Sequence, residues 1–358
     1  MSLAVTVLKT SAVLLLFLLF ISCGTKNKEY ANNVFPYSQF PQEKELKGEV
    51  IELDTALFRY PFRIRIEGDK AIVLDLHGSD YYGHLFQYPS FRYLSSFGRR
   101  GDSPLEMLSM ENFRLHNHTL WTLDANKSEL TRLDFSSSGD SLLREATVAL
   151  DEDILRPLDF AIYNDTTFVI PDYSGESRFL KVDCKGKLIE KIGTIPTTNK
   201  KALQEARPAL AQAWRSFLDY NSHNSVLATV TQLGEVVELY NLKDSTHVIR
   251  VGEYDEPEFK VSDGYGIPTG IMGFSDVQVT DDAIYAVFHG TSFKDIARQS
   301  GRLSDGGKYI YVFSLKGEPL CKYVLDHYIY GIWVDEVTKT ITATDVNNDQ
   351  PILKFSFG

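Results

Sequence analysis

The chain has 358 residues, a formal net charge of −11 and only three cysteines. Its length suits one large domain or two medium ones. An acidic chain without a basic stripe argues against nucleic acid as a partner, and three cysteines are too few for a scaffold built from disulfides.

The first 22 residues have the pattern of a secretory signal peptide. Lys9 precedes an apolar run over residues 12–21, which is about ten residues long and so shorter than the roughly 20 that a membrane-spanning helix needs. The run ends at Ser22, Cys23 and Gly24. These three residues resemble a bacterial lipobox, which implies lipidation of Cys23 and a membrane anchor. The alternative is an ordinary cleaved signal followed by a chance cysteine.

Residues 23–45 are predicted to form a flexible tether, because the part that follows Cys23 is polar and short of large aliphatic side chains. Surface lipoproteins of Bacteroides-type cells resemble one another in carrying acidic residues just after the cysteine. Here Lys26 and Lys28 precede a single acidic residue, Glu29. We therefore expect a cell-envelope protein anchored to a bacterial membrane, the outer membrane being favoured, with the periplasmic or surface face left open.

From about residue 62 onward, short β-type runs alternate with tight turns. Six sharply apolar runs begin at residues 71, 119, 166, 225, 283 and 339, at steps of 48, 47, 59, 58 and 56 residues. Each has a β-like run before it and another after it, and the first five are completed by a fourth run. A four-stranded repeat near this length is typical of a β-propeller blade, whereas separate sandwich domains would not give so regular a pattern.

The sixth repeat lacks a fourth strand, because residue 358 follows directly after the third. An unused strand lies at residues 48–54, before the first repeat. Pairing it with residues 352–358 closes the ring and removes two exposed sheet edges. We therefore predict an all-β fold, a six-bladed β-propeller over residues 46–358 with four-stranded blades, whose last blade is closed by the N-terminal strand.

A glycine-rich segment, FGRRGDSPLEM, follows the first repeat. Gly98, Gly101, Pro104 and Glu106 match a G-x-x-G-x-x-P-x-E joint. This joint resembles that of TolB-like six-bladed propeller lipoproteins of Bacteroides-type bacteria, although a second glycine common after the proline is Leu105 here. The resemblance implies the same propeller architecture over roughly residues 45–358 and assigns no particular activity.

Nearly all excess loop length falls on one predicted face of the propeller, which we call the long-loop face. Its loops are the b–c loops and the links between blades, at residues 98–109, 151–158, 197–212, 253–273 and 290–308. Long loops on a rigid scaffold are where binding usually resides, and the alternative is a neutral accumulation of insertions. One helix is expected there, over residues 200–218 and interrupted by Pro208.

Aromatic and arginine side chains in or beside these loops are the predicted ligand-binding residues. Rings and guanidinium groups can stack on sugars or grip a peptide, although the same rings can simply pack the loops together. The candidates are Tyr81, Tyr82, Arg99, Arg100, Tyr173, Trp214, Tyr254, Tyr265, Phe293 and Arg298.

An enzymatic alternative depends on oxygen ligands at the central channel. The predicted innermost strands contribute Asn112, Asp159, Asp219 and Asp276. Such a ring could hold calcium (Ca2+), as in the lactonase-like propellers that resemble this architecture, and the competing interpretation is the polarity of a water-filled channel. The sequence contains no nucleophile elbow, zinc-protease motif or P-loop.

The sequence therefore favours a lipid-anchored envelope propeller that binds a glycan, a peptide or a partner protein through its long-loop face, without catalysis and without a cofactor. The alternative is a metal-dependent hydrolase or lyase with calcium at the channel mouth. Cys184 and Cys321 fall in different, non-adjacent repeats, so we expect free thiols.

Overall fold

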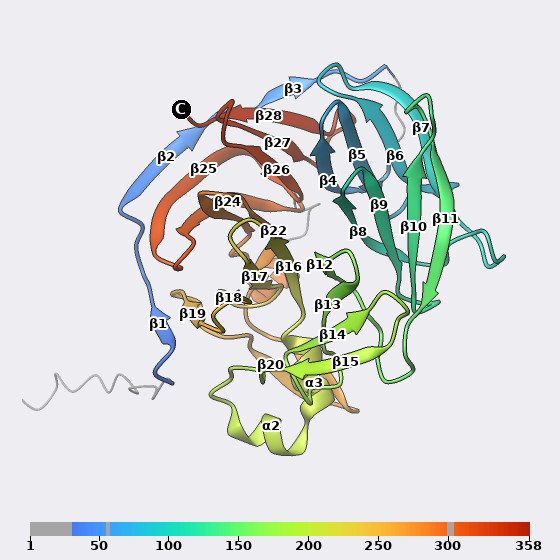
Figure 1. The fold of residues 1–358 in the computed structure, drawn as a ribbon. Coiled ribbons are helices and arrows are strands. Elements are labelled where there is room, and N and C mark those ends of the chain that lie inside the picture. Colours follow the sequence, from blue (N-terminus) through green and yellow to red (C-terminus); the bar gives the residue numbers. More distant parts are fainter. Residues whose placement is uncertain (1–30, 55–57, 299–303) are drawn as a thin grey trace, which may run out of the picture. The chain divides into compact units, whose positions relative to one another are not determined.

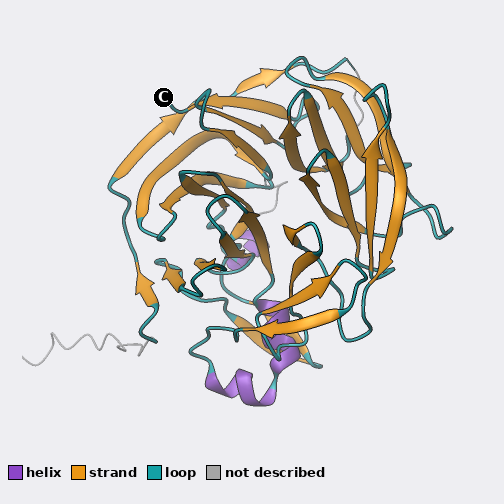
Figure 2. Cartoon of the chain, in the orientation of Figure 1, coloured by secondary structure: helices purple, strands orange, loops and turns teal. Residues whose placement is uncertain are grey.

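Each of the six predicted repeats is a four-stranded antiparallel sheet in the computed structural model, which describes residues 31–54, 58–298 and 304–358. The predicted signal peptide and Cys23 lie outside the described residues. Residues 33–358 form one unit, and its strands are shown in Figures 1 and 2. Blade one consists of β4 (Pro61–Glu67), β5 (Lys70–Asp75), β6 (Tyr81–Gln87) and β7 (Arg92–Arg99). Blade two consists of β8 (Met110–His116), β9 (Thr119–Asp124), β10 (Glu129–Phe135) and β11 (Leu142–Ala149).

The next three blades follow in chain order. Blade three consists of β12 (Ala161–Asn164), β13 (Thr167–Pro171), β14 (Phe179–Asp183) and β15 (Leu188–Ile192). Blade four begins with β16 (Ser216–Asn221), β17 (Val226–Thr231), β18 (Val236–Asn241) and β19 (His247–Val251). Blade five begins with β22 (Phe274–Val279), β23 (Ala283–Phe288), β24 (Gly307–Ser314) and β25 (Pro319–Ile329).

Blade six joins the two ends of the propeller. It consists of β26 (Ile332–Asp335), β27 (Thr340–Thr344), β28 (Ile352–Ser356) and β3 (Glu49–Ile51). Strand β3 runs antiparallel to β28, with Ile51 opposite Ile352. The innermost strands of successive blades contact one another, and β26 contacts β4, so the ring is closed. The predicted six blades and the closure by the N-terminal strand are confirmed.

The second strand of each blade explains why the repeats could be seen in the sequence. In β17 and β23 every residue is buried, because neighbouring blades cover both faces of the sheet. Strands covered on both faces become continuous apolar runs instead of alternating ones. Each fully buried valine, leucine or isoleucine contributes about 1.5–3 kcal/mol to folding.

Two segments assigned to the tether in the sequence analysis are strands in the structure. Strand β1 (Val34–Pro36) pairs in parallel with β19, and β2 (Gln42–Leu46) pairs in parallel with β25. With β3 they form a strap over residues 34–51, which follows the outer edges of blades four, five and six (Figure 1). Edge strands have unpaired main-chain groups, and the strap satisfies them.

The long-loop face contains the described helices and a small hairpin. Helix α2 (Lys200–Glu205) begins at Asn199, whose side chain accepts a hydrogen bond from Ala202 N at 3.0 Å. Helix α3 (Arg207–Ala213) has Pro208 in its first turn, where the missing N–H costs nothing. The single interrupted helix expected over 200–218 is thus two short helices, and β16 begins at Ser216 because the chain must enter blade four.

Two further elements on this face were not predicted. They are helix α4 (Phe293–Arg298) and the hairpin of β20 (Phe259–Ser262) and β21 (Tyr265–Pro268), which forms a two-stranded sheet of its own. Cys184 and Cys321 are free, as expected.

Candidate functional site

Buried arginine–carboxylate pairs fill the central channel. Arg63 and Arg65 of β4 both pair with Asp276 of β22, and Arg65 does so at 3.1 Å. Arg114 of β8 pairs with Asp159, which directly precedes β12, at 2.7 Å. All five side chains are at most 7% exposed.

The same guanidinium groups also bind main-chain oxygens of other blades. Arg65 donates to Ile332 O at 3.0 Å, and Arg114 donates to Leu218 O at 2.7 Å. The channel arginines therefore fasten the innermost strands of several blades to one another. Removing one partner of such a buried ion pair strongly destabilises the folded protein, because the other charge is left buried without compensation.

The four predicted calcium ligands all lie in this network or beside it. Asn112 Nδ2 donates to Asp159 Oδ1 at 2.7 Å, whereas Asp219 accepts from Val279 N at 2.8 Å. Asp276 accepts from Ile332 N at 2.9 Å in addition to its arginines. Within residues 31–54, 58–298 and 304–358, no group of three or more His, Cys, Asp or Glu side chains has metal-binding geometry. Calcium would compete with arginines for these oxygens, and the predicted site stays a prediction.

The pKa values of the channel groups follow from burial and pairing. Burial alone would raise the pKa of Asp276, but the charges of Arg63 and Arg65 outweigh it and the pKa is lowered. Burial raises the pKa of Asp219, and Arg65 and Arg114 oppose the rise only in part. Burial lowers the pKa of Arg63 to about 10. The Asp276 carboxylate is thus held in its charged form by its partners.

Several predicted ligand-binding residues are used to pack the loops. The guanidinium carbon of Arg100 lies 3.6 Å from the ring centroid of Tyr82, whose hydroxyl donates to Leu108 O at 2.6 Å. Trp214 is 1% exposed, and the hydroxyl of Tyr173 is buried. A ligand cannot reach the Tyr82 and Trp214 rings, which are 4% and 1% exposed, without moving the loops.

The remaining candidates are accessible but lie in different places. Tyr81 and Arg99 belong to blade one, Tyr265 belongs to the β20–β21 hairpin, and α4 begins at Phe293 and ends at Arg298. Tyr254, which is 47% exposed, is the one candidate that lines a pocket described below. The ten predicted residues therefore do not form one site.

The glycine-rich joint after blade one has a structural explanation. Gly101 has a φ of 154°, and a Cβ atom there would lie 2.0 Å from Glu106 Oε2. That carboxylate accepts from Ser103 N at 3.3 Å, and Lys127 Nζ donates to Glu106 O at 2.7 Å. The motif thus folds the link between blades one and two back on itself.

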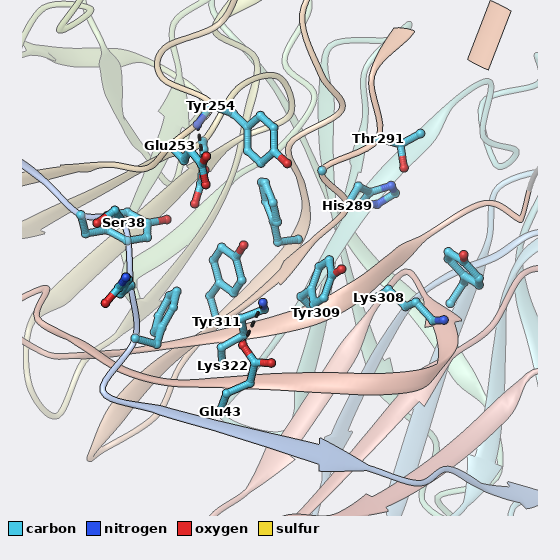
Figure 3. A pocket seen from close by; sticks show the side chains of 17 residues that line it. Ser38, Glu43, Glu253, Tyr254, His289, Thr291, Lys308, Tyr309, Tyr311 and Lys322 are labelled. Carbon is cyan, nitrogen blue, oxygen red and sulfur yellow. Dashed lines mark hydrogen bonds and ion pairs between the residues drawn. The ribbon is translucent and has the colours of Figure 1, made fainter. Parts of the chain in front are cut away.

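A pocket of about 600 Å³ lies between blades four and five, where the strap crosses from one to the other. Its walls come from the strap, from loops of the long-loop face and from strands β24 and β25 (Figure 3). The lining residues include Tyr37, Phe40, Glu43, Glu235, Glu253, Tyr254, Phe288, His289, Lys308, Tyr309, Tyr311, Lys322 and Tyr328.

Aromatic rings form a continuous row along this pocket. The ring centroids of Tyr254 and Phe288 are 6.1 Å apart, and those of Phe288 and Tyr311 are 4.8 Å apart. The ring centroid of Tyr311 lies 4.7 Å from that of Phe40 in the strap and 6.4 Å from that of Tyr309. The strap thus supplies part of the wall.

The charges of the pocket are less completely paired than those of the channel. Lys322 forms an ion pair with Glu43 at 3.0 Å and lies over the Tyr309 ring at 4.7 Å. Lys308 lies over the Tyr328 ring at 5.2 Å. Among the described residues, neither Lys308 nor Glu253 has an ion-pair partner.

Glu235 is the most buried charged group in the pocket, at 3% exposure. It accepts from Tyr254 N at 3.1 Å, and a Cβ atom on Gly252 would lie 1.9 Å from its carboxyl carbon, so only glycine allows this approach. Burial raises the pKa of Glu235, and the charge of Glu253 adds to the rise. Burial also lowers the pKa of His289 to about 4, which leaves its imidazole neutral at pH 7.

Most residues of this pocket were not predicted from the sequence. Tyr309, Tyr311 and Lys322 lie on strands that read as ordinary blade strands, and their partners in the strap are more than 250 residues away. The channel arginines did leave a signal, because Arg63 and Arg65 alternate with apolar residues in FRIRIE. Alternating arginines on an innermost strand indicate a polar channel face.

The fold defines a six-bladed β-propeller with a strap and a lateral pocket. The sequence matches the model of the TolB-like 6-blade propeller-like family over residues 39–337, and the chain belongs to this family. The resemblance inferred from the glycine-rich joint is thereby confirmed. No curated protein matches the chain in a sequence comparison.

Solved structures from Bacteroides share the fold. A protein of Bacteroides fragilis described as exported is 12% identical, with a TM-score of 0.57 over 90% of this chain and 98% of that one. A member of the DUF4221 family from Bacteroides vulgatus is 9% identical, with a TM-score of 0.55 over 88% and 96%. An auxiliary nutrient binding protein from Bacteroides ovatus is 10% identical, with a TM-score of 0.53 over 84% and 70%. Among the residues that the structure describes, no helix is both long and apolar enough to cross a membrane.

Proposed function

We propose that the chain is a lipid-anchored propeller of the bacterial cell envelope that binds a small polar ligand, a glycan fragment or a peptide, without catalysing its conversion. The observation that carries this proposal is the pocket of about 600 Å³ between blades four and five. It contains a row of aromatic rings and two charged groups, Lys308 and Glu253, that have no ion-pair partner among the described residues. Ligand pockets of proteins usually measure about 300–1,000 Å³.

The chemistry of the pocket suits a ligand with both apolar faces and polar edges. The rings of Tyr254, Tyr309 and Tyr311 offer flat surfaces, and their hydroxyl groups can donate and accept hydrogen bonds. Tyr309 and Tyr311 lie on β24, which is paired with β23 on one side and β25 on the other, so these two rings need little ordering when a ligand binds. The similar protein from Bacteroides ovatus is described as an auxiliary nutrient binding protein, which supports a binding role here.

A binding screen with a matched pair of variants tests this proposal. Purified protein is screened on glycan and peptide arrays, and hits are measured again with Tyr309→Ala and with Tyr265→Ala. We expect Tyr309→Ala to weaken binding about tenfold, since a stacking face is lost, and Tyr265→Ala, on the hairpin outside the pocket, to leave it unchanged. Equal effects of the two variants contradict the pocket, and the absence of any hit favours a purely structural envelope component.

The anchor is tested separately. The signal-peptide pattern and the lipobox-like residues 22–24 support lipidation of Cys23, and the similar protein from Bacteroides fragilis is described as exported. Cys23→Ser should release the protein from the membrane fraction of cells that express it, while the unchanged chain stays bound. Retention of the variant in that fraction contradicts lipidation.

A further inference from the structure

The pocket between blades four and five has an excess of negative charge at one end. Glu43 is compensated by Lys322, to which it is bound at 3.0 Å. His289 is neutral, so among the described residues that line the pocket only Lys308 remains to balance Glu235 and Glu253. Figure 3 shows Glu253 and Lys308 on opposite sides of the Tyr309 and Tyr311 rings.

The surroundings of Glu235 favour a cation over any other ligand group. This carboxylate is 3% exposed and receives a main-chain hydrogen bond from Tyr254. Tyr37 and Tyr311 are close enough for its charge to raise their pKa values, in addition to the larger effect of burial. The faces of aromatic rings attract cations, and this attraction grows where water is excluded.

We infer that the pocket takes a ligand with a protonated amine, whose ammonium group lies between Glu235 and Glu253 and whose remainder extends along Tyr311 and Tyr309 towards Lys308. This inference rests on the proposed function and narrows its ligand. The shared chemistry is a primary ammonium group, which an amino sugar or the N-terminus of a peptide can supply.

A metal ion suits this end of the pocket less well than an ammonium group. Calcium takes six to eight oxygen ligands, and magnesium needs an octahedral set. Glu235 and Glu253 provide two carboxylates, and the lining includes the rings of Tyr37, Tyr254 and Tyr311. An ammonium group needs only a few acceptors and gains from the rings as well.

Two matched pairs of probes test the inference by isothermal titration with the purified protein. One pair is chitotriose with free amines and its fully N-acetylated form, and the other is a tripeptide with a free N-terminus and its N-acetylated form. At pH 6.5 the tripeptide amine is protonated, since the α-amino pKa is about 7.7–8.0. The sugar amines are less basic and are protonated in part at this pH. We expect the free member of at least one pair to bind about tenfold more tightly, because a charge-assisted hydrogen bond to a carboxylate is lost on acetylation.

A charge-matched pair of variants shows whether Glu253 causes the preference. Glu253→Gln should reduce the preference for the free amine about fivefold. Glu258→Gln makes the same change in net charge on an exposed glutamate outside the pocket, and it should leave the preference intact. Both residues are exposed, so neither variant is expected to affect folding.

The outcomes separate this inference from the proposed function. Equal affinity for free and acetylated probes, or equal effects of the two variants, overturns the inference. If an acetylated probe binds and Tyr309→Ala abolishes its binding, the pocket remains a ligand site. In that case only the inferred requirement for a protonated amine is wrong. If no probe binds, the inference is also overturned, and the arrays decide separately whether the pocket binds anything.

Discussion

The central channel and the lateral pocket both contain arginine or lysine beside carboxylates, but they use these charges differently. In the channel, Arg63, Arg65 and Asp276 are at most 5% exposed and are bound to one another and to main-chain groups. In the pocket, the Lys322 and Glu43 side chains are 25% and 61% exposed, and Lys308 and Glu253 have no ion-pair partner among the described residues.

This difference separates charges that hold the fold from charges that are available to a ligand. A buried ion pair resists displacement, because breaking it leaves an uncompensated charge. A half-exposed group contributes little to stability and can exchange water for a ligand at small cost. The two regions should therefore respond to mutation in opposite ways, one through stability and the other through binding.

Removing the shared carboxylate of the channel should have the largest effect. Asp276→Ala leaves Arg63 and Arg65 buried without their partner, and we expect the free energy of unfolding to fall by about 3–5 kcal/mol. Urea unfolding followed by circular dichroism measures the loss. Asp282→Ala, on the exposed turn that follows β22, should cost about 0.5 kcal/mol or less.

Similar losses for the two aspartate variants would contradict the structural role of the channel pairs. The same proteins also test the calcium hypothesis. If Asp276 holds calcium, added calcium should raise the melting temperature of the unchanged protein and not that of Asp276→Ala. If Asp276 stays paired with the arginines instead, calcium should change the melting temperature of neither protein.

His289 should make stability depend on pH. Its pKa is about 4 in the folded chain, against 6.5 for an unperturbed histidine, because burial disfavours the charged form. The unfolded chain therefore binds more protons between these values, and stability falls as the pH drops from 6.5 towards 4, by about 2–3 kcal/mol. His289→Gln should flatten this part of the curve measured by urea unfolding, and parallel curves for the two proteins contradict the assignment.

The strap should matter for both stability and binding. Phe40→Ala removes ring contacts with Tyr37, Tyr311 and Phe313, and we expect a loss of about 1–2 kcal/mol because Phe40 is only half-buried. It should also weaken ligand binding, since Phe40 is part of the pocket wall. Phe35→Ala, on the same strap but 43% exposed and outside the pocket, is the control and should leave binding unchanged.

The propeller could be predicted because its strongest signals are local. The second strand of each blade is buried on both faces, so it appears as an apolar run at a regular step. The closure by β3 followed from counting strands, because an unpaired edge in the last blade needs a partner. These signals depend on burial, which leaves a pattern in the sequence.

The strap and most of the pocket could not be predicted, for a related reason. Four of the five residues of β2 are exposed, and its pairing with β25 uses main-chain groups that any sequence provides. The pocket joins the strap, blade four and blade five, and no local pattern indicates that these segments meet. Tyr254 was predicted because its loop is long, whereas Trp214, which directly follows α3 beside another long loop, is buried.

The smallest effect on stability should come from the ion pair of the pocket. Glu43→Gln breaks the pair with Lys322, and since Glu43 is largely exposed we expect a cost of less than about 1 kcal/mol. Glu205→Gln breaks a comparable exposed pair with Lys201 on α2, at 3.9 Å, and should cost as little. Urea unfolding measures both.

Binding should nevertheless distinguish these two variants. Without Glu43, the charge of Lys322 is uncompensated in the pocket and repels a protonated amine, so we expect a several-fold weaker affinity for the free-amine probe. Glu205 lies on a helix outside the pocket, and its loss should leave that affinity unchanged. A large stability cost for Glu43→Gln would place the pair with those of the channel, because only charges that are bound chiefly by the protein are costly to unpair.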